Sequence, residues 1–334
     1  MSPCVAIIAD DLTGALDTST PFVRHGMSVA VAVSVESVAE ALASRPQVLA
    51  VNTASRNMPV EAAARAVTKA AATLLRDRRP GIIFKKVDSR LKGNIGAETA
   101  ALAEMLGLAR VVVAPAVPDQ QRFARGGAVV GRGMDAPLAI APLFSGLKLQ
   151  TDIRDAESDG DLDRIVAEGA WDCTLAVGAR GLGAAFARLL GSKGMTEPRC
   201  RLDPQATLFA FGSTDPITLA QIDAIRPFAD IVEGPAGNLP APLSSRLPVV
   251  LNTAAVCAAP SETVAGRFAE GVARFIDACR PSALVMGGGD TTLAILRRLG
   301  AGVLHPVGEA APGLPAFDIE FGSGTLLRCV ASSV

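Results

Sequence analysis

Two neighbouring carboxylates, Asp10 and Asp11, come directly after the apolar segment Val5–Ala9 near the start of the chain. A carboxylate in this position can deprotonate a substrate hydroxyl or accept a hydrogen bond from a sugar hydroxyl. Because adjacent carboxylates repel each other, we expect the pKa of one of them to be raised. The structural alternative is that an aspartate caps the first turn of a following helix. One member of the pair can cap the helix while the other does chemistry, and the sequence leaves both roles open.

A dense basic segment, Lys85–Asn94, also follows an apolar stretch. Its sequence is KKVDSRLKGN, and such positive charge suits a carboxylate or a phosphoryl group that is being transferred. The alternative is a charged loop that contacts only solvent. Its place directly after a predicted strand, together with the Gly93-Asn94 turn, favours a binding site. Arg56, which follows the apolar segment Val48–Val51, can add a bidentate contact to a carboxylate.

A glycine-rich segment, GGGDTT at residues 287–292, lies between a predicted strand and a predicted helix. Glycines allow backbone amides to approach a phosphate closely, and the N-terminus of a helix favours an anion. The segment matches neither G-x-x-x-x-G-K-[ST] nor G-x-G-x-x-G, which excludes a standard P-loop and gives only weak support to a dinucleotide fold. The alternative is a tight turn in which Thr291 or Thr292 caps the helix. A second segment of this kind, Gly212-Ser213-Thr214, ends another predicted strand in the same half and favours phosphate binding.

Other residue types that often carry chemistry give weaker signals. Arg122, Arg125 and Arg132 lie among glycines, where they either line a ligand site or face solvent. The two histidines, His25 and His305, lie in no motif. The six cysteines are scattered without a C-x-x-C pair, so we predict reduced thiols and no zinc or dithiol site.

The elements that position these residues alternate between short apolar strands and helices. In the first half the expected strands are Val5–Ala9, Val29–Val33, Val48–Val51, Ile82–Phe84, Arg110–Ala114 and Leu175–Val177. The expected helices are Thr13–Arg24, Ala39–Ala43, Val60–Arg76, Gly96–Leu106 and Gly183–Leu190. This alternation predicts a mainly parallel sheet, and ligands bind such sheets beyond the carboxyl ends of the strands. The segments that follow three of the strands are therefore predicted to form one site: Asp10–Thr13, Asn52–Arg56 and Lys85–Asn94.

A second α/β unit is expected from about Ala206. Its predicted strands are Leu208–Phe211 and Ala283–Met286, and its predicted helices are Pro216–Ala224, Ser261–Ala278 and Leu293–Leu299. The start of the long helix, Ser261-Glu262-Thr263, loosely matches a capping box. Before this unit we expect hairpin strands within Pro115–Pro137, an acidic surface connection at Asp152–Asp163 and a linker at Gly191–Gln205.

Length and composition limit the class of protein. A chain of 334 residues is expected to form two domains. The net charge of −1 argues against a dedicated nucleic-acid binder. No apolar run reaches the roughly 18 residues that a bilayer requires, and the N-terminus lacks the basic region of a signal peptide. We therefore expect a cytoplasmic protein without membrane or nucleic-acid partners.

Taken together, these motifs resemble those of the four-carbon acid sugar kinase family. The resemblance covers nearly the whole chain, and its most specific parts are IADDLTGA at residues 8–15 and KKVDSRLKGN at residues 85–94. It continues through Arg125-Gly126-Gly127, Val177–Leu182, Phe211-Gly212-Ser213, Gly288–Thr291 and Gly308–Gly313.

The resemblance implies two α/β domains, each a mainly parallel sheet flanked by helices, with the active site in the cleft between them. Residues 1–200 would bind the sugar acid and residues 206–334 the nucleotide. It implies transfer of a phosphoryl group from ATP, with Mg²⁺, to a terminal hydroxyl of a four-carbon or similar small sugar acid, such as a threonate, erythronate or oxo-tetronate.

Two features depart from the pattern of that family. Its members end with a Lys-Ser-Gly loop that contacts the nucleotide, whereas this chain ends Cys329-Val330-Ala331-Ser332-Ser333-Val334. Ser332 and Ser333 are candidates to replace part of that loop. The middle of the chain is also shortened around Leu143–Asp163.

The leading hypothesis is therefore a carbohydrate kinase, with a homodimer as one option for its assembly. The residues predicted to be catalytic are Asp10, Asp11 and Lys86. Those predicted to bind substrate are Thr13, Arg56, Asp88, Ser89, Arg90 and Asn94. Those predicted to contact nucleotide are Ser213, Gly288, Gly289, Asp290 and Thr291. The alternative is a non-catalytic sugar-acid-binding protein derived from such a kinase, while a Rossmann-type dehydrogenase lacks its dinucleotide fingerprint.

Overall fold

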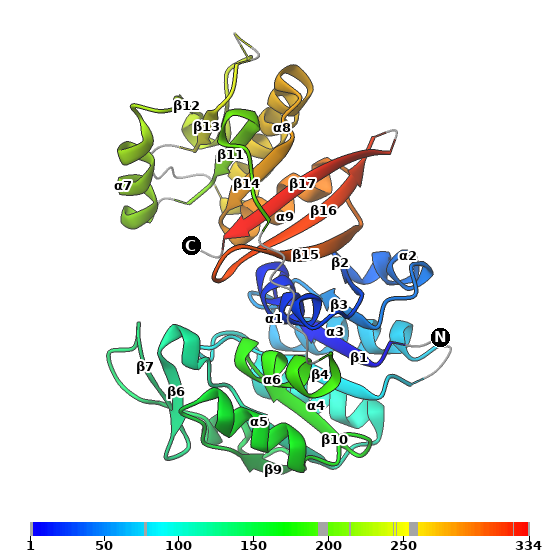
Figure 1. Ribbon diagram of the computed structural model, residues 1–334. Helices are drawn as coiled ribbons and strands as arrows, with labels where there is room; N and C mark the ends of the chain where they lie inside the picture. Colours follow the sequence, from blue (N-terminus) through cyan, green and yellow to red (C-terminus); the bar gives the residue numbers. More distant parts are fainter. Residues whose placement is uncertain are drawn as a thin grey trace. The chain divides into compact units, whose positions relative to one another are not determined.

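The computed structural model describes residues 3–76, 79–192, 200–213, 215–242, 244, 246–253, 260–322 and 324–332. The chain divides into two compact units, residues 1–197 and residues 198–334 (Figure 1). The predicted α/β architecture, with mainly parallel sheets flanked by helices, is confirmed. Within the described residues, no helix combines the length and the apolar character needed to span a bilayer.

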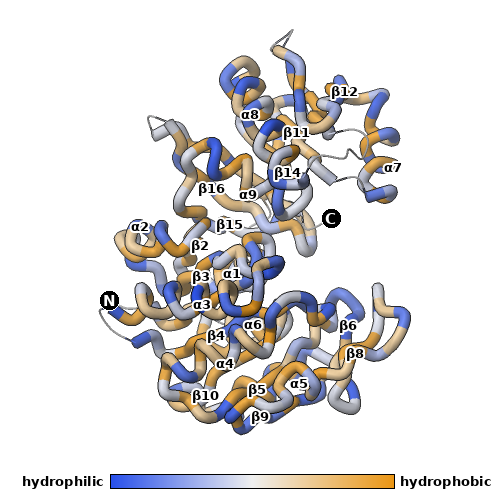
Figure 2. The backbone as a smooth tube through the Cα atoms, turned by 180° about the vertical axis from the view of Figure 1, so that it is seen from behind, coloured by the Kyte–Doolittle hydropathy of each residue, from blue (hydrophilic) through white to orange (hydrophobic). Residues whose placement is uncertain are grey.

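The first unit is built on seven parallel strands in the order β2-β3-β1-β4-β10-β5-β9. These are β1 (Val5–Ala9), β2 (Val29–Ala32), β3 (Val48–Asn52), β4 (Ile82–Lys86), β5 (Arg110–Ala114), β9 (Gln150–Ile153) and β10 (Thr174–Gly178). Every residue of β1 is fully buried, as expected for a central parallel strand that is covered on both faces. The interior strands β5 and β10 are accordingly apolar in Figure 2.

Among the residues described, the helices that accompany this sheet are α1 (Leu12–Arg24), α2 (Val38–Ala43), α3 (Val60–Leu74), α4 (Ile95–Leu106), α5 (Asp159–Glu168) and α6 (Arg180–Leu190). Helix α1 packs on α6, and α3 packs on α4. The chain leaves β1 towards β2 and leaves β4 towards β5, which lie on opposite sides of the β1–β4 pair. The carboxyl ends of β1 and β4 therefore flank a topological switch point, where parallel sheets bind ligands.

The segment between β5 and β10 agrees only in part with the prediction. The expected hairpin forms from β6 (Arg122–Arg125) and β7 (Ala128–Gly131), and β8 (Leu138–Ala139) extends it. The prediction of a surface connection at Asp152–Asp163 is wrong, because this stretch contains the end of β9 and the start of α5. Two of its acidic residues, Asp159 and Asp161, lie in the first turn of α5, while the helix buries Leu162, Ile165 and Val166 on one face.

The second unit contains seven strands in the order β12-β13-β11-β14-β17-β16-β15. They are β11 (Thr207–Phe211), β12 (Asp230–Glu233), β13 (Val249–Asn252), β14 (Ala283–Gly287), β15 (Val303–Ala311), β16 (Leu314–Phe321) and β17 (Thr325–Ser332). The first five in this order are parallel, and β15, β16 and β17 pair antiparallel. Among the helices here are α7 (Pro216–Ile225), α8 (Ser261–Cys279) and α9 (Gly289–Arg298).

Two details of the second unit correct the sequence analysis. The loosely matched capping box at Ser261 does not form, because the residue at the N-cap of α8 is Pro260, which has no side-chain acceptor. Helix α9 begins at Gly289 rather than at Leu293, so the glycine-rich segment itself forms the first turn. The antiparallel strands after residue 300 were not predicted either, because Pro306 and Gly308 interrupt the extended pattern of β15.

Candidate active site

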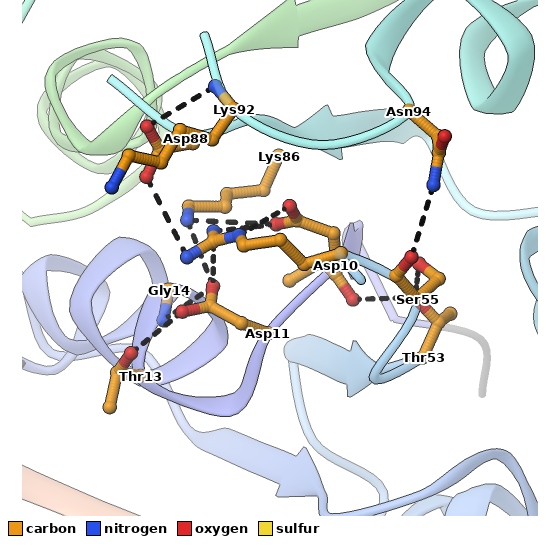
Figure 3. Close-up of polar contacts among 12 residues, drawn as sticks. Asp10, Asp11, Thr13, Gly14, Thr53, Ser55, Lys86, Asp88, Lys92 and Asn94 are labelled. Carbon is orange, nitrogen blue, oxygen red and sulfur yellow. Dashed lines mark hydrogen bonds and ion pairs between the residues drawn. The ribbon is translucent and has the colours of Figure 1, made fainter. Parts of the chain in front are cut away.

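The site in the first unit is formed where three neighbouring strands end. In the sheet β1 lies between β3 and β4, with Ala9 opposite both Asn52 and Lys86. The structure thus brings together the three polar segments that were grouped from the sequence (Figure 3). Asp10 and Asp11 come from β1, Arg56 from the loop after β3, and Lys86 from the last position of β4.

Arg56 connects these strand ends. Its Nε lies 2.8 Å from Asp10 Oδ2 and its Nη2 lies 3.0 Å from Asp10 Oδ1, which is a bidentate contact. The same Nη2 lies 2.9 Å from Asp11 Oδ1, and Nη1 lies 3.6 Å from Asp88 Oδ2. A planar guanidinium is suited to such simultaneous contacts. Arg56 therefore holds three carboxylates from two other segments in one arrangement.

Lys86 is the second cation of the site and is almost fully buried. Its Nζ lies 3.1 Å from Asp11 Oδ1 and 3.9 Å from Asp10 Oδ1. The approach of Lys86 to Asp11 depends on Gly14, because a Cβ atom at that position would overlap both Lys86 Nζ and Asp11 Oδ1. The glycine of the IADDLTGA motif thus makes room for the ion pair.

Asp11 is also the N-cap of α1. Its Oδ1 accepts a hydrogen bond of 3.1 Å from Gly14 N, and its Oδ2 accepts one of 2.7 Å from Thr13 Oγ1. One member of the acidic pair therefore caps the helix, as one interpretation of the sequence proposed. The hydroxyl of Thr13 therefore orients this carboxylate.

The electrostatics of the acidic pair differ from the expectation. Burial alone would raise the pKa of Asp10, but Lys86, Lys85 and Arg56 outweigh it and hold the pKa below its ordinary value. Burial also tends to raise the pKa of Asp11, but Lys86 and Arg56 outweigh burial there, and the pKa falls to about 2. The prediction that repulsion raises one of the two pKa values is wrong, because cations surround both carboxylates. The pKa of Lys86 is in turn raised, because Asp11 and Asp10 outweigh its burial.

A buried ion pair behind the site was not predicted from the sequence. Lys85 Nζ lies 2.7 Å from Glu98 Oε2, and both side chains are about 1% exposed. Glu98 Oε1 accepts a 2.7 Å hydrogen bond from Ser55 Oγ, which in turn bonds Thr53 Oγ1. Lys85 was grouped with the ligand-binding basic residues, but its ammonium group lies inside the protein. Its role in the structure is to hold the loop that carries Arg56.

The remaining predicted substrate residues lie around the acidic pair. Asn94 Nδ2 donates to the backbone oxygens of Ser55 and Met58, so it holds the Arg56 loop from the other side. Ser89 Oγ accepts a 2.8 Å hydrogen bond from Arg122 Nη1. The side chain of Arg90 is exposed, and only its backbone amide contacts Asp88.

Of the three arginines among glycines, Arg122 is thus connected to the predicted site through Ser89. Arg125 instead makes a surface ion pair with Glu157. Arg132 contacts Arg122 through its backbone, because its carbonyl oxygen accepts a hydrogen bond from Arg122 Nε.

A second ionic cluster extends the site towards β10. Arg180, the first residue of α6, follows β10, whose Gly178 pairs with Lys86. Its Nη1 lies 2.6 Å from Asp17 Oδ1 on α1, and its Nε lies 3.3 Å from Asp119 Oδ2. The sequence analysis placed none of these three residues in the site. The signal that could have found them is the position of Arg180 at another strand end of the same sheet.

In the second unit the two glycine-rich segments lie side by side. Strands β11 and β14 are neighbours, with Phe211 opposite Gly287, and Gly212 N donates to Gly287 O. A Cβ atom at Gly212 would overlap Thr291 Oγ1, so the two segments approach as closely as glycine allows. Gly288, at the N-cap of α9, has a φ of 92°, a conformation that favours glycine.

The other predicted nucleotide residues lie at the same place. A Cβ atom at Gly288 would stand 3.8 Å from Ser213 N, and Gly289, Asp290 and Thr291 form the first turn of α9. Ser332 lies opposite Gly287 on β17, and its backbone oxygen accepts from Gly288 N. Ser333, the other candidate to replace the nucleotide loop, lies outside the described residues, as does Thr214. A helix N-terminus framed by glycines fits a phosphate group.

No group of three or more His, Cys, Asp or Glu side chains among the described residues is arranged to hold a metal ion.

Comparison with known proteins finds relatives of this chain. Residues 5–143 match the family model described as a sugar-binding N-terminal domain. The chain is 41% identical to a D-threonate kinase of Cupriavidus necator over 128 residues, which is 38% of this chain and 29% of that protein. It is 28% identical to a D-threonate kinase of Bordetella bronchiseptica over 383 aligned residues, covering 99% of this chain and 94% of that protein.

The fold has a known counterpart as well. A crystal structure of a Haemophilus influenzae protein superposes with a TM-score of 0.71 at 20% identity, covering 98% of this chain and 96% of that one. For several curated relatives the matched part covers 35–38% of this chain and only 27–29% of their length.

Proposed function

We propose that this chain, which is similar to four-carbon acid sugar kinases, phosphorylates a terminal hydroxyl of a small sugar acid. Relatives named as D-threonate, D-erythronate and 3-oxo-tetronate kinases support this substrate class. The observation that carries the proposal is the cluster of Asp10, Asp11, Arg56 and Lys86 at one edge of the sheet. Carboxylates and cations so arranged can bind the hydroxyls and the carboxylate of a sugar acid.

The first unit supplies the acceptor site. Asp10 and Asp11 are ionised at neutral pH, because their pKa values are lowered, and they can accept hydrogen bonds from substrate hydroxyls. Within the described cluster their oxygens already receive the donors of Arg56, Lys86, Gly14 and Thr13. The pair is therefore better suited to orienting the substrate than to removing a proton.

The substrate carboxylate requires a cation that is not already neutralised. Asp10, Asp11 and Asp88 outnumber Arg56 and Lys86, so the inner cluster carries a net negative charge. Arg90, whose side chain is exposed at the rim, is the residue we assign to the substrate carboxylate. Lys86 keeps a positive charge at the base of the site, since its pKa is raised.

The second unit supplies the donor site. ATP bound with Mg²⁺ would provide the phosphoryl group and neutralise its charge. Ser213, Gly288, Gly289, Asp290 and Thr291 are the residues that we assign to the phosphates. Their backbone amides and the N-terminus of α9 would stabilise the anion without a Walker-type lysine.

Two measurements test this proposal. Release of ADP in the presence of each four-carbon acid should show activity with at least one acid, and Arg90→Ala should raise KM for that acid. Arg125→Ala, which removes an exposed arginine paired with Glu157, is the matched control and should leave KM unchanged. Calorimetry with ATP and Mg²⁺ separates the alternative: binding of a sugar acid without binding of ATP at millimolar concentration would indicate a non-catalytic binding protein.

A further inference from the structure

A third carboxylate, Asp17, lies on α1 one turn beyond Thr13, on the same side of the helix. Its Oδ1 contacts Arg180 Nη1 at 2.6 Å. Arg180 in turn contacts Asp119, so the guanidinium is fixed between two carboxylates. The acceptor site described above makes no use of Asp17.

The oxygens of Asp17 differ from those of the acidic pair. Asp10 uses both oxygens for Arg56, and Asp11 receives hydrogen bonds at both of its oxygens. Asp17 Oδ2, by contrast, accepts no hydrogen bond from any residue that the structure describes. The Asp17 side chain is 26% exposed, close to the 23% of Asp11, whereas that of Asp10 is 4% exposed, so the unbonded oxygen is what distinguishes Asp17 from Asp11. A general base needs an oxygen that a substrate hydroxyl can reach.

The charges around Asp17 also set it apart. Burial raises its pKa above the ordinary value, and this effect outweighs Arg180 on α6 and Lys86 on β4, which lower it. Asp119, after β5, adds to the rise, and Arg122 on β6 is a further charged neighbour. Where neighbouring carboxyl groups have pKa values pushed in opposite directions, the groups take different roles in proton transfer.

We propose that Asp17 accepts the proton of the attacking hydroxyl, while Asp10 and Asp11 hold Arg56 and Lys86 in place. This assignment rests on the proposed phosphoryl transfer. The hydroxyl oxygen forms a bond to the γ-phosphorus of ATP, and the bond from that phosphorus to the β–γ bridging oxygen breaks. Its electron pair leaves with ADP, and the hydroxyl proton passes to Asp17 Oδ2. When the products leave, Asp17 returns this proton to water.

The test compares Asp17→Asn with the wild type on an acid that the wild type phosphorylates. We expect kcat to fall by roughly 10²- to 10⁴-fold, the range for loss of a general base, with little change in KM for the sugar acid. The wild-type kcat should also fall as the pH drops through the pKa of Asp17, and Asp17→Asn should lose this dependence. Asp17→Glu should recover part of the activity.

The matched control is Asp163→Asn. Asp163 also accepts a hydrogen bond from an arginine of α6, at 2.8 Å from Arg188 Nε. It lies outside the site, so its substitution should leave kcat unchanged. If Asp17 only positioned Arg180, activity would fall at every pH alike and the acidic limb would remain. That result, or an unchanged kcat, would overturn the assignment.

A second readout does not depend on activity. Carbon NMR of protein labelled in its aspartate carboxyl groups should show one signal that is lost in Asp17→Asn and that titrates above 3.8, the ordinary value. A signal that titrates at or below this value would contradict the proposal. A wild type that is inactive with every acid would refute the proposed function, whereas activity that survives Asp17→Asn would refute the role of Asp17 alone.

Discussion

Replacing Arg56 with lysine tests whether its guanidinium holds the strand ends of the site together. Lysine keeps the charge but lacks the planar group that makes three contacts of 2.8–3.0 Å to Asp10 and Asp11. One ammonium group can keep about one of these contacts. Loss of the other two, at about 1.5 kcal/mol for each hydrogen bond to a charged group, should lower the free energy of unfolding by about 3 kcal/mol.

Trp171 makes this measurement specific. It is the single tryptophan of a chain that has no tyrosine, and it lies in the first unit, so its fluorescence reports the unfolding of that unit in urea. Arg125→Lys is the control, because Arg125 makes the same kind of contact with Glu157 but is 63% exposed. We expect the control to lose much less stability than Arg56→Lys, because a solvent-exposed ion pair contributes little. Equal losses at both arginines would refute the claim that Arg56 is a structural centre of the site.

Three further changes should have measurable effects. Gly14→Ala should displace Lys86 Nζ from the capping carboxylate and raise KM for the sugar acid on the order of tenfold, about 1.4 kcal/mol, whereas Gly266→Ala, in a helix with open space around it, should not. The pKa of Asp11 is lowered from 3.8 to about 2. The ionised carboxylate therefore contributes about 2 kcal/mol to the free energy of unfolding above pH 3.8, and this contribution is lost as the pH falls from 3.8 to about 2. Asp11→Asn should therefore flatten the acid side of the unfolding curve, and an unchanged curve would contradict the ion pairs. Gly212→Ala should clash with the Thr291 side chain and abolish calorimetric binding of ATP while sugar-acid binding persists; loss of both would point to misfolding instead.

The fold could be predicted where the periodicity of the sequence was clear. The predicted strand Val5–Ala9 and the predicted strand Arg110–Ala114 have the observed bounds, because short runs of buried apolar residues between turns leave few alternatives. The strands β12 and β13 and the antiparallel strands that follow α9 were missed. β15 and β16 each contain a buried proline and lack a strict alternation of buried and exposed residues, so the strand pattern is weaker.

The location of the site could be predicted from the sequence, but the role of each residue in it could not. Adjacent residues of a strand point to opposite faces, so Lys85 and Lys86 are separated, with one facing Glu98 and the other Asp11. The sequence cannot show which of the two lysines has a buried carboxylate partner, because Glu98 lies on a later helix whose packing is not visible in the sequence. Asp17 lies two residues beyond the IADDLTGA motif, and its pairing with Arg180 depends on how α1 packs on α6.

The central claim is that this chain transfers a phosphoryl group from ATP to a small sugar acid. Phosphorus NMR of a reaction with ATP, Mg²⁺ and each of D-threonate, D-erythronate and 3-oxo-tetronate tests it most directly. The account predicts a new phosphomonoester signal with at least one acid, in step with the formation of ADP, and its loss in Asp17→Asn. Formation of inorganic phosphate alone, or no change in ATP with any of the acids, would contradict it.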